Sequence, residues 1–125
     1  MRRVFKTRFF TRWLRKTELS DAALCQAIVE MAQGLIDADL GGGLVKKRVA
    51  LPGRGKSGGA RTVVATNKGS RWIFVFGFEK NDRANITAEE LQALKDLAQD
   101  ILSNTAVQLA QALEDGALQE ICHEH

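Results

Sequence analysis

Residues 58–90 read GGARTVVATNKGSRWIFVFGFEKNDRANITAEE, in which two runs rich in β-branched and aromatic residues are followed by a helix start. The runs predict strands over Ala60–Thr66 and Arg71–Phe78. The turn NKGS between them is short enough for an antiparallel pair. The second run, RWIFVFGF, is apolar at successive positions, which predicts a central strand buried on both faces. Thr87 with Glu90 three residues later forms a capping box, so a helix is expected to begin here.

Two helical patterns follow this stretch. Apolar residues recur at helical spacing from Leu91 to Leu102, which predicts a strongly amphipathic helix. Residues 104–121 predict further helical structure with a break at Asp115-Gly116. We therefore interpret residues 1–103 as one domain and residues 104–125 as an acidic helical extension.

The chain before this stretch alternates between strand and helix patterns. Leu44–Leu51 predicts a strand, and the exposed charges of KKRVAL favour an outer position in the sheet. Three glycines at 41–43 end the preceding region, because successive glycines cost too much backbone entropy within a helix. Ser20 and Asp21 offer an N-cap to a helix with an apolar stripe. Residues 9–14 predict a short helix, and Val4–Thr7 predicts a first strand.

The order strand, two helices, three strands and a helix indicates a single α+β domain. We predict a small antiparallel-rich sheet of about four strands, packed against an N-terminal helical hairpin and a C-terminal helix. A chain of 125 residues is long enough for one such core.

Charge is distributed unevenly along the chain. Residues 1–85 hold 17 Lys/Arg against 7 Asp/Glu, a net +10, whereas residues 86–125 hold 1 against 8, a net −7. This asymmetry indicates a body that faces a polyanion, joined to an acidic end. Two roles stay open for the acidic end. It packs on the protein's own basic face and weakens polyanion binding, or it forms a packing or dimer surface.

Several classes of site and location are not indicated by the residues. Cys25 and Cys122 lie in apolar helical patterns without Cys-x-x-Cys spacing, so we expect reduced thiols and neither a metal site nor a redox motif. His123 and His125 belong to a terminal HEH, which is typical of a solvated tail. No apolar run is long enough to span a bilayer, and the basic start does not resemble a signal peptide. We expect a cytoplasmic protein without a cofactor.

The order of elements resembles the RelE/ParE superfamily of toxins over about Val4–Ser103. The stretch at residues 58–90 is similar to the RelE-type branch found beside helix-turn-helix antitoxins, often labelled HigB-like. Members carry an arginine in the penultimate strand, here Arg61, and a basic segment after the last strand, here residues 79–83. The resemblance implies catalysis at these two places. A tyrosine near the last helix also contributes in RelE, whereas this chain contains no tyrosine.

The activity implied by the resemblance is ribosome-dependent endonuclease cleavage of messenger RNA, which inhibits translation. In such cleavage a ribose 2′-hydroxyl attacks the adjacent phosphate, and the reaction needs proton transfer and charge stabilisation. Arg61 and Arg83 are expected to stabilise the transition state, because a guanidinium donates two hydrogen bonds to phosphate oxygens. Lys80, and second Lys56, are the candidates for proton transfer. A surface salt bridge of Arg83 with Asp82 or Glu79 stays an equal alternative.

Further cations and one aromatic residue are expected to bind RNA. Alternation places Lys46 and Arg48 on one face of their strand and Lys47 on the other. Alternation also places Lys80 on the face of Trp72, Phe74, Phe76 and Phe78, of which we expect only Phe78 to stack on a base. The full set of RNA-binding candidates is Lys46, Lys47, Arg48, Arg54, Lys68, Arg71 and Phe78.

The resemblance also implies partners. These are messenger RNA on the ribosome, a cognate helix-turn-helix antitoxin, and operator DNA only as the toxin–antitoxin complex; no membrane partner is expected. Two alternatives to the nuclease stay open, a non-enzymatic ParE-like inhibitor of gyrase and a degenerate module that binds nucleic acid or antitoxin. The convergent cations favour the nuclease.

Overall fold

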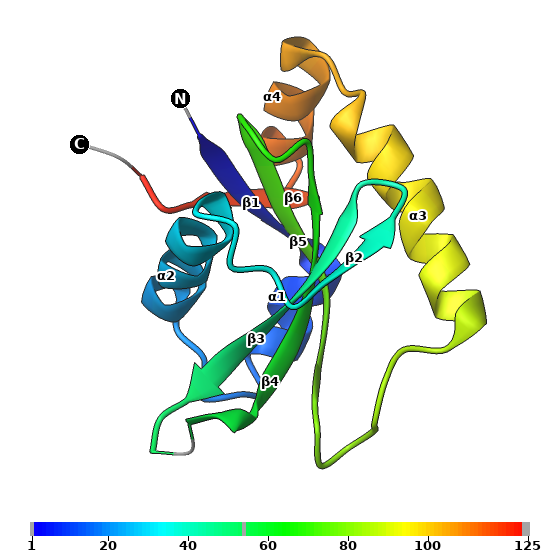
Figure 1. Ribbon diagram of the computed structural model, residues 1–125. Helices are drawn as coiled ribbons and strands as arrows, with labels where there is room; N and C mark the ends of the chain where they lie inside the picture. The colour runs from blue at the N-terminus through cyan, green and yellow to red at the C-terminus, as the bar shows by residue number, and fades with distance from the viewer. Residues whose placement is uncertain (1, 54, 124–125) are drawn as a thin grey trace.

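The computed structural model describes residues 2–53 and 55–123, with the side chains of residues 55–58 excepted. The chain forms a six-stranded sheet with helices on both faces (Figure 1), which confirms the α+β class. In chain order the elements are β1 (Arg3–Thr7), α1 (Arg8–Leu14), α2 (Asp21–Ala32), β2 (Ala38–Gly41), β3 (Leu44–Leu51), β4 (Gly55–Thr66), β5 (Arg71–Glu79), α3 (Ala88–Leu102), α4 (Ala106–Glu114) and β6 (Leu118–Ile121).

The sheet has the strand order β2-β3-β4-β5-β1-β6. β5 lies between β4 and β1, so its predicted central position is confirmed, and it pairs antiparallel with β4 and parallel with β1. The predicted outer position of β3 is wrong, because β2 pairs with it on the side away from β4. Gly41, Gly42 and Gly43 all have positive φ, which makes them the turn of this hairpin rather than a helix end.

The end of the chain differs in part from the predicted helical segment with a break at Asp115-Gly116. α4 ends at Glu114 and the break at Asp115-Gly116 is confirmed, with Gly116 at a φ of +80°. Residues 118–121 then form the edge strand β6 instead of a helix. β6 pairs antiparallel with β1 and buries Leu118 and Ile121.

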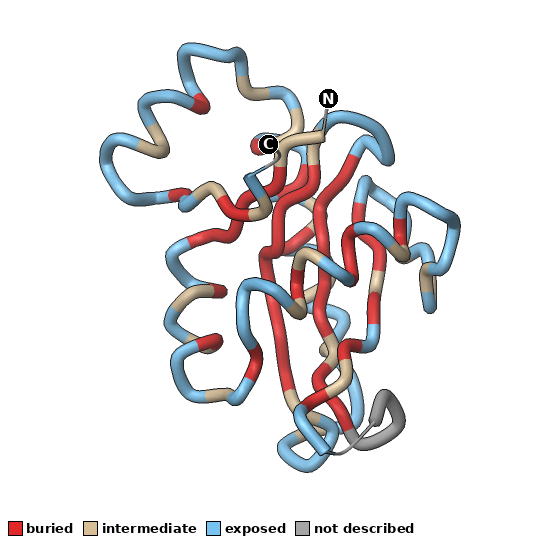
Figure 2. The backbone as a smooth tube through the Cα atoms, turned by 90° about the vertical axis from the view of Figure 1, so that its left-hand side faces the viewer, coloured by how far each residue is buried: buried red, intermediate tan, exposed pale blue. Residues whose placement is uncertain are grey.

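Each face of the sheet has its own apolar core. On the side of α1 and α2 the largest buried residues include Phe10, Leu24, Ile28, Trp72 and Phe74. The core on the side of α3 and α4 includes Phe5, Val63, Ile73, Leu94 and Ile101. Figure 2 shows the buried positions running along the strands, with exposed positions on the outer sides of the helices and in the loops.

A bulge in β5 changes which side chains share a face. Val63 pairs with Phe76 and Val64 with Phe74, so Val75 is an extra residue in β5. Trp72 and Phe74 therefore belong to the α1/α2 core, whereas Phe76 and Phe78 belong to the α3/α4 core. The predicted common face of Trp72, Phe74, Phe76, Phe78 and Lys80 is therefore wrong. Strict alternation does not hold across a bulge.

A disulfide joins Cys25 of α2 to Cys122, which directly follows β6, so the expected reduced thiols are not what the structure contains. The two Cα atoms lie 5.4 Å apart although 97 residues separate them in sequence. Pairing of β6 with β1 carries the chain end back to α2. This pairing was missed in the sequence, because residues 118–121 predict a helix.

Candidate nucleic-acid interface

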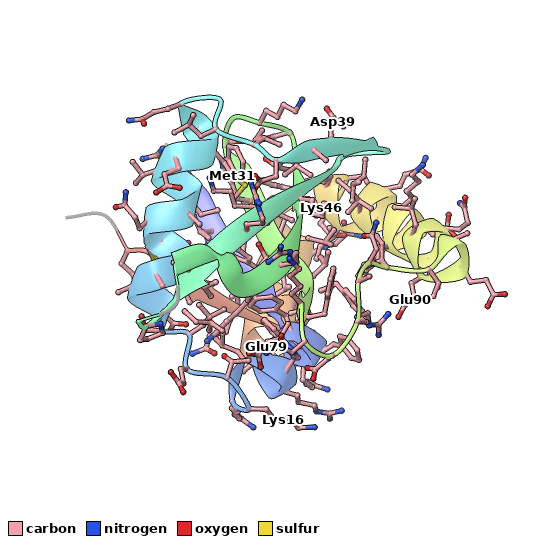
Figure 3. All side chains as sticks on the ribbon, turned by 60° about the horizontal axis from the view of Figure 1, so that its bottom comes forward. Lys16, Met31, Asp39, Lys46, Glu79 and Glu90 are labelled. Carbon is pink, nitrogen blue, oxygen red and sulfur yellow. A yellow bond between two sulfur atoms is a disulfide. The ribbon has the colours of Figure 1, made fainter. Side chains whose placement is uncertain are left out.

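Three cations lie on the α3-facing side of strands β3 and β4. In the sheet, Arg61 of β4 is the cross-strand neighbour of Arg48 in β3 and of Phe78 in β5. Lys46, two residues before Arg48 in β3, is the cross-strand neighbour of Val63 in β4. Alternation along β4 puts Arg61 on the face of Val63, which belongs to the α3/α4 core. Arg48 is exposed, and Lys46 and Arg61 are half-buried. Figure 3 brings the lower end of the molecule in Figure 1 forward, with α2 and α3 on opposite sides of the sheet, and labels Lys46 on β3 and Glu90 near the start of α3.

Arg83 completes this group from the loop between β5 and α3. Its guanidinium lies 5.3 Å from the ring centre of Phe76 and 5.9 Å from that of Phe78. It also donates to the carboxylate of Glu90, so its ion-pair partner is Glu90 and not Asp82 or Glu79. We call Lys46, Arg48, Arg61 and Arg83 the cation cluster. Arg61 donates to the carbonyl oxygen of Gly59 at 3.1 Å, which orients its side chain.

The contact between Arg83 and Glu90 has an electrostatic consequence. The hydrogen bond from Arg83, together with one from the backbone N–H of Thr87, lowers the pKa of Glu90 below its ordinary value. A carboxyl group whose pKa is lower in the folded chain stabilises the fold above its ordinary pKa. That contribution is lost as the pH falls through the lowered pKa.

Arg83→Gln is therefore expected to raise the pKa of Glu90 toward its ordinary value and to reduce the loss of stability in acid. An NMR titration of the Glu90 carboxyl carbon measures this pKa. Wild-type protein titrated in parallel, with Glu120 as an internal reference, is the control, because Glu120 is held by Arg3 instead. An unchanged Glu90 titration in Arg83→Gln would contradict the assigned ion pair.

Lys80 lies just beyond β5 and is exposed. With the other described residues it makes no hydrogen bond or ion pair. Glu79, its neighbour, pairs with Ala60, next to Arg61, so Lys80 lies at the same end of the sheet as Arg61. Arg54 and the side chain of Lys56, which the sequence also nominates, lie outside the described residues.

Two predicted RNA-binding residues are buried, and their predicted role is wrong for this structure. Lys47 faces α2, where it is 4% exposed, pairs with Glu30 at 2.9 Å and donates to the carbonyl of Leu35 at 2.8 Å. Phe78 is 3% exposed within the α3/α4 core and offers no free ring face for a base.

Lys46 and Lys47 are adjacent in β3, and substituting them one at a time distinguishes a lysine that binds RNA from one that stabilises the fold. Lys47→Met leaves the largely buried carboxylate of Glu30 without this partner, so we expect the free energy of unfolding to fall by about 3 kcal/mol. Lys46→Met on the other face should change it by no more than about 0.5 kcal/mol. Denaturant unfolding measures both, and RNA binding should weaken only in Lys46→Met. Weaker RNA binding by a stably folded Lys47→Met protein would contradict the assignment.

Two more predicted cations lie at the opposite end of the sheet. Lys68 pairs with Asp39 at 2.8 Å. Arg71 donates to the carbonyl oxygens of Leu102 and Asn104, at the C-terminal end of α3. Arg71 and Phe78 are about 20 Å apart along β5, given the rise per residue of a strand. The fold therefore does not bring Lys68 and Arg71 to the cation cluster.

The acidic C-terminal segment does not contact the cation cluster through the interactions seen in the described residues. Glu120 accepts two hydrogen bonds from Arg3, at 2.9 and 3.0 Å. Arg8 donates to the carbonyl oxygens of Asp115 and Gly116. The arginines that donate to this segment are thus Arg3, Arg8 and Arg71, none of which belongs to the cation cluster.

Phe9 belongs to the apolar pattern that predicts a short helix over residues 9–14, and it was not among the predicted site residues. The structure leaves it 60% exposed at the start of α1, with its ring stacked on Phe76 at 6.0 Å between centroids. Phe10 and Leu14 of the same apolar pattern are buried, and the pattern itself does not distinguish Phe9 from them. Within residues 2–53 and 55–123, no group of three or more His, Cys, Asp or Glu is arranged to hold a metal ion.

Comparison with known families gives one match over nearly the whole chain. The family described as RelE toxin of the RelE/RelB toxin–antitoxin system matches residues 2–121. The matched region ends with β6, so it includes α4 and β6 as well as the cation cluster. The comparison with curated proteins gave no match.

Proposed function

Because the chain belongs to the RelE family of toxins of toxin–antitoxin systems, we propose that it is a ribosome-dependent endoribonuclease that cleaves messenger RNA. Such cleavage inhibits translation. The observation that carries the proposal is the cation cluster. Lys46, Arg48 and Arg61 share a face of the paired strands β3 and β4, and Arg83, from the loop between β5 and α3, lies over the ring of Phe78, the neighbour of Arg61 in β5.

The chemistry of the cation cluster suits phosphodiester cleavage. When a ribose 2′-hydroxyl attacks the neighbouring phosphorus, negative charge grows on the non-bridging oxygens. Guanidinium groups stay protonated and donate paired hydrogen bonds to such oxygens. Arg61 is oriented by Gly59, and Arg83 is held by Glu90 and two aromatic rings. These two side chains are the ones proposed to stabilise the transition state.

Proton transfer is assigned to a lysine. Lys80 is exposed at the same end of the sheet as Arg61, with no partner among the described residues to hold it elsewhere. Lys56 is the second candidate. The chain has no tyrosine, and its two histidines lie within the last three residues.

Partners follow from the family. A RelE toxin implies an antitoxin and the translating ribosome as general partners. We propose that the antitoxin carries a helix-turn-helix domain, that operator DNA is bound only by the toxin–antitoxin complex, and that the protein acts in the cytoplasm. In the described part of the chain, no helix is both long and apolar enough to cross a membrane.

A reconstituted translation reaction tests the proposal. Purified protein is added to a defined messenger RNA with or without ribosomes and initiation factors, and the RNA 5′ ends are mapped by primer extension. New ends are expected only when ribosomes engage the message. Translation arrest without new ends would instead support a non-enzymatic inhibitor, and cleavage of naked RNA at the same rate would contradict ribosome dependence.

A further inference from the structure

A groove of about 610 Å³ runs along α3, outside the cation cluster. Val75 and Phe76 of β5 line it, α3 contributes Leu94, Leu97 and Ile101, and the junction of β1 and α1 contributes Phe9. Its lining is mostly apolar. The acidic side chains that reach it are Glu90, which is paired with Arg83, and Asp100 toward the C-terminal end of α3.

Phe9 gives this groove an aromatic surface beside a cation. One side of its ring stacks on Phe76, with an angle of 12° between the ring planes. Phe76 in turn lies beneath the guanidinium of Arg83. Because Phe9 is 60% exposed, its ring can still accept a flat ligand. Stacking of unpaired bases on such rings is the usual way in which proteins hold single-stranded RNA.

A second, basic hollow of about 450 Å³ adjoins the groove. Arg8 and Arg12 of α1 and Arg15, directly after its end, line this hollow, and Arg8 and Leu118 line both cavities. Arg12 and Arg15 are exposed, and neither pairs with an acidic group among the described residues. Lys16, labelled in Figure 3, adds another exposed positive charge at the end of α1. Closely spaced cations without acidic partners favour an anionic ligand.

We propose that these two cavities together bind one unpaired nucleotide of RNA that lies outside the cleaved linkage. The base stacks on Phe9 in the groove, and its phosphate is bound by Arg12 and Arg15 in the basic hollow. The inference rests on the proposed function for the identity of the nucleic acid. The positive charge of Arg12 and Arg15 beside the exposed ring of Phe9 favours a nucleotide, which is anionic, over an apolar peptide helix as the ligand of these cavities.

The role of the base is tested by fluorescence anisotropy with the full chain at low salt. The probes are a short single-stranded oligoribonucleotide and the same sugar–phosphate chain without bases. Phe9→Leu should weaken binding of the intact probe about five- to twentyfold, as expected for loss of one stacked base. Binding of the abasic probe should not change, and Phe9→Trp should retain wild-type affinity for both.

The role of the arginines is tested by salt dependence. Arg12→Ala with Arg15→Ala should weaken both probes about tenfold at low salt and make the slope of log Kd against log salt shallower by about 0.7, because the two arginines bind one phosphate of a single strand. Lys95→Ala is the matched control, since Lys95 lies on the other side of α3 beside Gly42. Thermal unfolding should show that all variants stay folded.

The possible outcomes separate this inference from the proposed function. Unchanged binding of the intact probe by both variants overturns the inference, even if Arg61→Ala abolishes cleavage. Unchanged RNA binding with weaker antitoxin binding also overturns it and assigns the groove to a protein partner. Base-dependent binding through Phe9 in a protein that cleaves no message supports the inference and contradicts the nuclease.

Discussion

Arg61→Ala should lower the rate of messenger-RNA cleavage by about 10²–10³, the usual cost of removing one donor that stabilises developing negative charge. Arg61 is half-buried at the centre of the cation cluster, between Arg48 and Phe78 in neighbouring strands. The rate is measured as the appearance of new 5′ ends in the reconstituted translation reaction.

Two further variants make this prediction specific. Arg61→Lys keeps the charge but not the paired hydrogen bonds of a guanidinium, so its rate should lie between those of wild type and Arg61→Ala. Lys68→Ala, at the opposite end of the sheet, should cleave at nearly the wild-type rate. Equal losses in Arg61→Ala and Lys68→Ala would show that general charge, and not the cation cluster, is what cleavage requires.

Removal of the disulfide should have the largest effect on stability. The bond closes a loop of 97 residues between α2 and the end of β6. Its loss restores conformational freedom to the unfolded chain, which is expected to lower the free energy of unfolding by about 4 kcal/mol. Denaturant unfolding of Cys25→Ala with Cys122→Ala, and of wild type with and without reductant, measures the change.

The double cysteine variant is also the control for the reductant. Reductant should destabilise the wild type to about the level of the variant and should leave the variant unchanged. Thiol alkylation under denaturing conditions should modify no cysteine in the oxidised wild type and both after reduction. Two reactive thiols in protein never exposed to reductant would contradict the disulfide.

The sequence predicts most of the secondary structure wherever local chemistry is strong. Thr87 and Glu90 form the predicted capping box at the start of α3, and the Ser20 side chain caps α2. The apolar run of β5 identified the central strand. The fold class followed from the order of these elements, because few arrangements of layers bury their apolar faces.

The edge strands could not be predicted in this way. β2 and β6 contain four residues each, and their conformation depends on pairing with β3 and β1. Leu118 and Ile121 are three residues apart, which is equally compatible with a helical stripe. The contact between Cys25 and Cys122 depends on β6, so the disulfide was missed for the same reason.

The candidate site was predicted in part. Lys46, Arg48 and Arg61 share a face because alternation is regular along the parts of β3 and β4 that carry them, and Arg83 reaches this face from the loop after β5. The bulge at Val75 moved Phe76 and Phe78 to the α3 face, which no residue pattern in RWIFVFGF indicates. The positions of Arg71 beside α3 and Lys47 beside α2 depend on where the helices pack, which the sequence alone does not specify.

The most direct test of the nuclease assignment is a map of messenger-RNA 5′ ends after controlled induction of wild type and Arg61→Ala in growing cells. We predict arrest of growth with new ends within translated regions in the wild type. Both effects should be lost in an Arg61→Ala protein that accumulates to the same level. Arrest without new ends, or the same ends in both proteins, would contradict RNA cleavage at the cation cluster.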